Sequence, residues 1–177
     1  MGSIIDAGLN VKLNNLIGKS NDLNRLADRI MSLVSNKSLM KNRSKALHPR
    51  IAHYYSLVFS DNIGEYQDLR GALTEYPGTD DGIGRSDFDK PYDAILELLN
   101  RTLVLESDVG DAAEYAEEIK DMATYQFLLH LLDGLVKVED QLAVISDILF
   151  AVGNDANGWM GLDYNIDKYI SVPKAGG

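Results

Sequence analysis

Hydrophobic positions recur along the first half of the chain at spacings of three, four and seven residues, as in helices with one buried face. The first stripe predicts a helix over about residues 8–38 and consists of Leu16, Leu23, Ala27, Ile30 and Val34. The second predicts a helix ending near Tyr76 and consists of Ile51, Tyr55, Val58, Asn62, Glu65, Leu69 and Leu73. Two long amphipathic helices are therefore expected before residue 77.

Two further stripes predict two more helices. The third begins at Tyr92 and continues through Ile95, Leu99, Thr102, Glu106, Val109 and Ala113. The fourth consists of Thr124, Leu128, Leu131, Leu135, Leu142, Ile145 and Leu149. Only about residues 118–121 separate these helices, and Gly153 with the NDANG that follows it is a helix stop signal.

The connection between the second and third helices is long. Residues 77–91, PGTDDGIGRSDFDKP, have no helical period. Extended, they reach roughly 50 Å, whereas a helix of about 28 residues is only about 42 Å long. The expected fold is therefore an all-α four-helix bundle over residues 1–152, with two antiparallel pairs joined by a long crossover between helices two and three. A simple up-down bundle would not need so long a connection, although it could carry one. Residues 153–177 are expected to form a tail packed on the bundle or on a neighbouring subunit.

Composition narrows the class of protein. The 177 residues suit one domain, and the absence of cysteine excludes disulfides, zinc–thiolate sites and cysteine nucleophiles. No apolar run approaches the roughly 20 residues of a membrane span, and the N-terminus has no basic-then-apolar signal pattern. We expect a soluble, cytoplasmic protein without a membrane partner.

The net charge of −10 is unevenly distributed. Residues 12–50 contain nine Lys or Arg and two Asp, a net charge of +7, and the basic residues are densest over residues 37–50. Such a cluster can meet phosphate or DNA. The alternative is a solvated connection whose charges pair with the acidic remainder, within the subunit or across a subunit contact. The acidity of the whole chain favours this alternative.

Acidic side chains on the predicted inward faces are candidate metal ligands. Glu106 falls at the centre of the third stripe, Glu65 within the second, Asp61 at its edge, and Glu139 on the flank of the fourth. A buried carboxylate needs a metal, a proton or a partner. Carboxylates that converge from several helices of a bundle are typical of di-iron and di-manganese sites.

Several segments resemble the ferritin-like superfamily. LNRL at 23–26 and LVLESD at 103–108 resemble the first- and third-helix motifs of bacterioferritin. Residues 121–142, DMATYQFLLHLLDGLVKVEDQL, are similar to the fourth helix of ferritin and bacterioferritin, and GLDYNIDKYI at 161–170 to the segment after it. The resemblance covers about residues 20–170. It implies a ferritin-like bundle, which DNA-protecting mini-ferritins share.

The metal ligands that the resemblance implies are incomplete. Glu106 matches the third-helix glutamate, and the Glu-x-x-His of the second helix falls near Asn62 and Glu65. On the fourth helix, Glu139 is the nearest acid. Asp61-x-x-x-Glu65 fits half of the mini-ferritin pattern, but no histidine precedes residue 48.

The resemblance implies a homo-oligomer, such as a cage, that binds or stores iron as mini-ferritins do, with weak or absent ferroxidase activity. A carboxylate site for another divalent metal is a variant of this hypothesis. The alternative is a non-catalytic structural or interaction protein that has lost its metal site, with the tail and the basic 37–50 cluster as contact surfaces. DNA protection through the basic cluster is a third hypothesis.

Overall fold

A computed structural model describes residues 4–37, 54–75, 77, 91–153, 155, 157, 158 and 161. The elements are α1 (Ala7–Lys37), the π-helix η1 (Tyr54–Ser60), α3 (Asp61–Leu69), α4 (Pro91–Glu118) and α5 (Met122–Val152). η1 continues directly into α3, so the two form one helix. The described ranges contain no strand, and none of their helices is long and apolar enough to cross a membrane.

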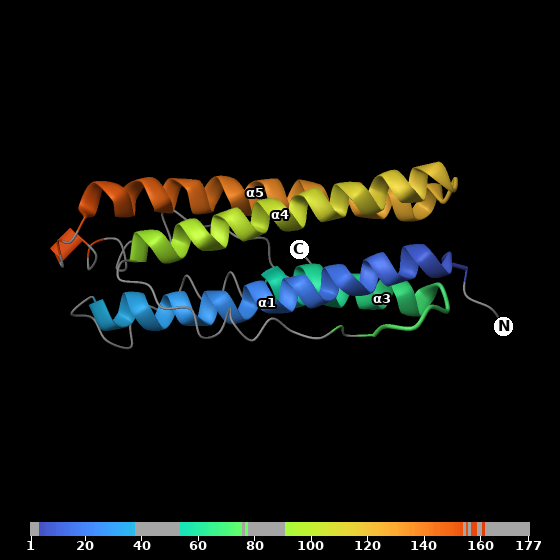
Figure 1. Ribbon diagram of the computed structural model, residues 1–177, viewed down its shortest axis with the longest axis horizontal. Helices are drawn as coiled ribbons and strands as arrows, with labels where there is room; N and C mark the ends of the chain where they lie inside the picture. Colours follow the sequence, from blue (N-terminus) through green and yellow to red (C-terminus); the bar gives the residue numbers. More distant parts are fainter. Residues whose placement is uncertain are drawn as a thin grey trace.

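The helices form two layers, with α1 and η1–α3 in one and α4 and α5 in the other (Figure 1). α1 runs antiparallel to η1–α3, and α4 runs antiparallel to α5. α4 runs parallel to α3 and begins at the end of the bundle opposite the end of α3. The predicted crossover between two antiparallel pairs is therefore confirmed.

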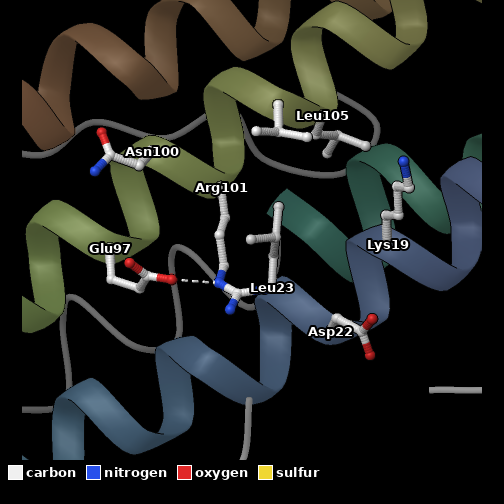
Figure 2. Close-up of a pocket in the computed structure, with 8 residues that line it drawn as sticks. Lys19, Asp22, Leu23, Glu97, Asn100, Arg101 and Leu105 are labelled. Carbon is white, nitrogen blue, oxygen red and sulfur yellow. Dashed lines mark hydrogen bonds and ion pairs between the residues drawn. The ribbon is translucent and has the colours of Figure 1, made fainter. Parts of the chain in front are cut away.

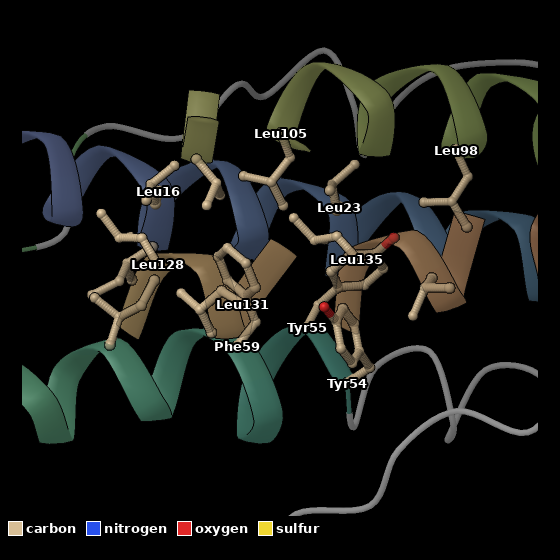
Figure 3. Close-up of a cluster of buried hydrophobic side chains, with 14 of the residues drawn as sticks. Leu16, Leu23, Tyr54, Tyr55, Phe59, Leu98, Leu105, Leu128, Leu131 and Leu135 are labelled. Carbon is tan, nitrogen blue, oxygen red and sulfur yellow. The ribbon is translucent and has the colours of Figure 1, made fainter. Parts of the chain in front are cut away.

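The core lies between the layers and draws side chains from every helix. Leucines from α1, α4 and α5 surround Tyr54, Tyr55 and Phe59 (Figure 3). On α5 the buried positions are Thr124, Leu128, Leu131, Leu135, Val138, Glu139, Leu142, Ile145, Ser146 and Leu149. This list contains every residue of the predicted fourth stripe. The expected turn before this helix is also confirmed, because α4 ends at Glu118 and α5 begins at Met122.

The second helix faces the core with a different set of residues from the predicted one. Its buried positions are Tyr54, Tyr55, Phe59, Ser60, Ile63 and Gln67. A π-helix has about 4.4 residues per turn, so residues five apart share a face, as Tyr54 and Phe59 do. The π-helix therefore shifts the register of α3. Leu69 and Leu73, which the regular period places inside, are 77% and 73% exposed.

The second helix also ends earlier than predicted, at Leu69 instead of near Tyr76. Gly71 adopts a left-handed conformation with φ 68°, its N–H donates to Asp68 O, and the N–H of Ala72 donates to Gln67 O. These two bonds form a Schellman motif, a common helix stop.

The chain then turns back along α1. The side chain of Gln67 is fully buried and donates to Asn10 Oδ1 and Asn14 Oδ1 at 2.8 Å each. Both asparagines donate in turn to Leu73 O. Pro77 lies so close to Gly18 that a Cβ there would be 2.4 Å from the proline Cγ. The start of the crossover is thus held on α1 by an amide network and a tight contact.

Candidate functional site in the bundle core

A hydrogen-bonded polar layer crosses the middle of the bundle. The hydroxyl of Ser20 donates to Tyr55 O at 2.7 Å, and the hydroxyl of Tyr55 lies 2.6 Å from Oγ1 of Thr102. Thr102 donates its own hydrogen to Leu98 O at 2.7 Å, so Tyr55 is the donor to Thr102. Ser20, Tyr55 and Thr102 are completely buried. The layer therefore joins α1, η1 and α4 with its hydroxyl groups satisfied.

Tyr55 of this layer and its neighbour Tyr54 are both neutral. Burial raises the pKa of Tyr54 and of Tyr55 above the ordinary value of 10, and the negative charge of Glu139 raises both further. Their rings meet edge to face with centroids 5.3 Å apart. Neutral phenols donate hydrogen bonds and are poor ligands for a metal ion. At this level of the bundle the second helix supplies packing and hydrogen bonds instead of carboxylate ligands.

Glu139 is the buried acid of the core. Its side chain is 8% exposed, and Oε1 accepts no hydrogen bond from the described residues. Burial, followed by the negative charges of Glu106 and Asp140, raises the pKa of Glu139 to about 7. Glu106 on α4 is half-buried. Glu139 was predicted on the flank of the fourth stripe and is buried, whereas Glu106 was predicted at the centre of the third stripe and is only half-buried. The negative charge of Glu106 acts on Glu139 across the α4–α5 pair.

The other two predicted ligands lie elsewhere. Asp61 and Glu65 are exposed on α3, one turn apart. The expectation that Glu65 faces the core is wrong, because the π-helix before α3 turns Ile63 and Gln67 inward in its place. The structure thus brings Glu106 and Glu139 together and separates Asp61 and Glu65 from them.

The described residues do not fit a dinuclear iron centre. Such a centre draws carboxylates from four helices and an imidazole from two of them. No group of three or more His, Asp or Glu in the described ranges could hold a metal ion. His130 is exposed, and the basic 37–50 cluster lies outside the described residues apart from the backbone of Lys37. Glu106 and Glu139 can supply at most a two-carboxylate site for one cation.

Sequence reasoning missed the polar layer and a groove between α1 and α4. Thr102 and Tyr55 belong to the predicted apolar stripes, and their hydroxyl groups on core positions were the available signal. The groove has a volume of about 470 Å³ (Figure 2). Leu23 and Leu105 line it, and Arg101 is paired with Glu97 at 2.6 Å. Lys19, at one edge, forms an ion pair with Asp108.

Comparison with solved structures identifies the fold. An engineered closed form of the ferritin from Archaeoglobus fulgidus superimposes with a TM-score of 0.75 and 19% identity, covering 96% of this chain and 99% of that chain. The open-pore ferritin of the same archaeon gives 0.73 and 20%, covering 92% and 97%. A humanized archaeal ferritin gives 0.78 and 18%, covering 92% and 96%. The fold is therefore that of the ferritin-like four-helix bundle. No protein-family model and no curated protein sequence matches the chain.

Proposed function

We propose that this chain is the subunit of a ferritin-like homo-oligomer that binds and stores iron as cargo without oxidising it in the bundle core. The shared fold with ferritins over nearly the whole length of both chains supports the assignment. The incomplete ligand set of the described core argues against a ferroxidase step.

The observation that carries iron binding is the buried Glu139 carboxyl with an oxygen that accepts no hydrogen bond from the described residues, beside Glu106. Two carboxylates that repel each other in a core are stabilised by a proton or by a divalent cation between them. Oxygen ligands of this kind suit Fe²⁺, Mn²⁺ and Mg²⁺. Asp61 and Glu65, exposed one turn apart, form a second and weaker pair for the same cargo at the surface.

The test is equilibrium binding of Fe²⁺ without oxygen, together with the native mass of the full chain. The wild-type protein should bind Fe²⁺ as an oligomer, and Glu106→Gln/Glu139→Gln should weaken binding at least tenfold. Glu114→Gln/Glu117→Gln removes two exposed carboxylates of α4 whose charges do not act on Glu139, which makes it the matched control. On admission of air, the protein should oxidise Fe²⁺ no faster than buffer does. A wild-type oligomer that binds no Fe²⁺ would overturn the proposal.

One observation favours a second candidate, a non-catalytic scaffold. The Ser20–Tyr55–Thr102 layer fills the middle of the bundle with satisfied hydroxyl groups, which a purely structural core requires. A scaffold would remain metal-free after incubation with Fe²⁺ and assemble equally well in the Glu106→Gln/Glu139→Gln variant. The same binding experiment therefore decides between the two functions.

A further inference from the structure

α5 carries apolar residues on its core face and along a second stripe. The core face is buried, and its residues include Leu128, Leu135 and Leu142. Along the second stripe, hydrophobic residues follow one another every seven residues, at Met122, Leu129, Val136, Ala143 and Phe150. Seven residues fall only about 20° short of two α-helical turns, so these five form a single stripe. We call this stripe, with the acidic residues that lie along it, the outer face of α5.

The hydrophobic side chains of the outer face are in contact with solvent. Met122 is 50% exposed and Val136 is 43% exposed. Phe150 is 71% exposed, but its ring lies against that of Tyr92 on α4, with centroids 5.4 Å apart. Isolated exposed hydrophobic residues are common on protein surfaces, but a row of them along one helix, interleaved with acidic residues, suits a partner molecule.

The outer face also carries a row of unpaired carboxylates. Asp133, Asp140 and Asp147 are exposed and again seven residues apart, so neighbouring carboxylates are separated by about 10.5 Å along the helix. In the parts of the chain that the structure describes, no Lys or Arg forms an ion pair with any of the three. Lys137, one turn from both Asp133 and Asp140, is the one lysine of α5. With three acids and one base, the face suits a partner that is both apolar and basic.

The chain contains a segment of this composition. Residues 37–50, KSLMKNRSKALHPR, contain five Lys or Arg and no acid, and Leu39, Met40 and Leu47 lie among the cations. The described elements on either side of this segment, α1 and η1, lie in the layer opposite α5 (Figure 1). The outer face of α5 does not face that layer, because a different side of the helix is the one buried in the core.

We propose that the outer face of α5 binds residues 37–50 of a second copy of this chain. The lysines and arginines pair with Asp133, Asp140 and Asp147, and the hydrophobic side chains cover Met122 and Val136. In a two-fold arrangement each subunit gives one segment and receives one, so the contact forms twice. This inference rests on the self-association in the proposed function, and it adds the surface that makes the contact.

Reversing the charges on each side tests the contact in the full chain, by sedimentation velocity. Lys37→Glu/Lys41→Glu/Lys45→Glu and Asp133→Lys/Asp140→Lys/Asp147→Lys should each raise the dissociation constant of self-association at least tenfold. An equimolar mixture of the two variants should associate again, because each supplies the charge that the other needs. Asp111→Lys/Glu114→Lys/Glu117→Lys places the same charge change on exposed positions of α4 and should leave the constant within twofold.

Three results would overturn the proposal. The first is a wild-type protein that is monomeric, and the second is a charge-reversed variant that associates as the wild type does. The third is a mixture of the two variants that does not associate, while a single chain with both sets of substitutions does. If a charge-reversed variant does not fold, Met122→Gln/Val136→Gln replaces it, with the same tenfold expectation. Fe²⁺ binding measured on the same samples separates the two proposals. If the wild type binds Fe²⁺ and the charge-reversed variants still associate as the wild type does, only the contact is refuted. If the charge reversals disrupt the oligomer but the wild type binds no Fe²⁺, only the iron site is refuted.

Discussion

The hydroxyl of Tyr55 lies 2.6 Å from Oγ1 of Thr102, so the second helix and α4 are hydrogen-bonded to each other inside the core. Thr102 in turn donates to Leu98 O, and the carbonyl of Tyr55 accepts from Ser20. A centre built in this way holds three helices together through neutral groups. We therefore expect these hydrogen bonds to contribute to the free energy of unfolding of the protein.

Removing either partner of this bond should destabilise the protein to a different degree. Tyr55→Phe removes a donor and leaves Thr102 bonded to Leu98 O, which should cost about 1 kcal/mol. Thr102→Val leaves the buried Tyr55 hydroxyl without a partner, which should cost about 2–3 kcal/mol. The double variant should cost less than the sum of the two, because both act on one bond. Urea denaturation measures all three, and equal losses for the two single variants would contradict the assigned direction of donation.

The stability of the bundle should fall as the pH rises from about 4.5 to 7. The pKa of Glu139 is raised to about 7 from an ordinary value of 4.5, so between these values the folded state binds more protons than the unfolded state. The loss should be on the order of 2–3 kcal/mol. Glu139→Gln should therefore stabilise the protein at pH 8 and not at pH 4. Denaturation midpoints across this range, with the exposed Glu117→Gln as the control, measure the difference, and parallel curves for Glu139→Gln and wild type would contradict it.

Two helical glycines should respond oppositely to alanine. Gly18→Ala places a Cβ 2.4 Å from Pro77 Cγ, so the start of the crossover must move off α1, at a cost of about 1–3 kcal/mol. Gly110→Ala meets nothing within 4 Å and should stabilise α4 by about 0.5–1 kcal/mol. Thermal unfolding of the two variants measures the contrast. A stabilised Gly18→Ala protein would show that Pro77 does not hold this contact in solution.

The turn between α4 and α5 contains a strained lysine. Lys120 has φ 63°, a left-handed conformation that glycine adopts at no steric cost. Lys120→Gly should therefore stabilise the protein by about 0.5–1 kcal/mol. Glu114→Gly, at an exposed position in the middle of α4, should instead destabilise it by about 1 kcal/mol. Guanidinium denaturation of both variants gives the comparison, and a loss of stability in Lys120→Gly would contradict the assigned strain.

The parts of the fold that follow a regular 3.6-residue period could be predicted from the sequence. α5 buries the whole of its expected stripe because nothing interrupts its helical geometry. α4 buries Ile95, Thr102, Val109 and Ala113 of its expected stripe and leaves Tyr92, Leu99 and Glu106 partly exposed. The length of the crossover favours the observed topology over a simple up-down bundle. The second helix could not be predicted in the same way. Its π-helix changes the register between Tyr55 and Ile63, and Leu73 continues an apolar period past the helix end at Leu69.

The same difference between regular and interrupted helices decides which residues of the candidate site could be predicted. Glu139 lies on a helix with an unbroken period and is buried on the flank of its predicted stripe. Glu106 is only half-buried, although the period places it at the centre of the third stripe. Glu65 lies after the π-helix, and its predicted inward position fails for that reason. Tyr55 and Thr102 are 47 residues apart in the chain, so their hydrogen bond could be found only from the structure. Periodicity assigns a residue to a face but does not identify its partner.

The π-helix places one more residue between the core-facing Tyr55 and Ile63 than a regular α-helix would. In a regular α-helix, the eight steps from Tyr55 to Ile63 would turn Ile63 about 80° away from Tyr55. Seven steps would fall only about 20° short of two full turns. A chain with one residue deleted between Ser56 and Val58 would therefore keep Tyr55 and Ile63 facing the same core in an uninterrupted α-helix. Homologues that differ here by a one-residue gap should superimpose on this bundle on both sides of the gap, which makes the segment a natural site for insertions and deletions.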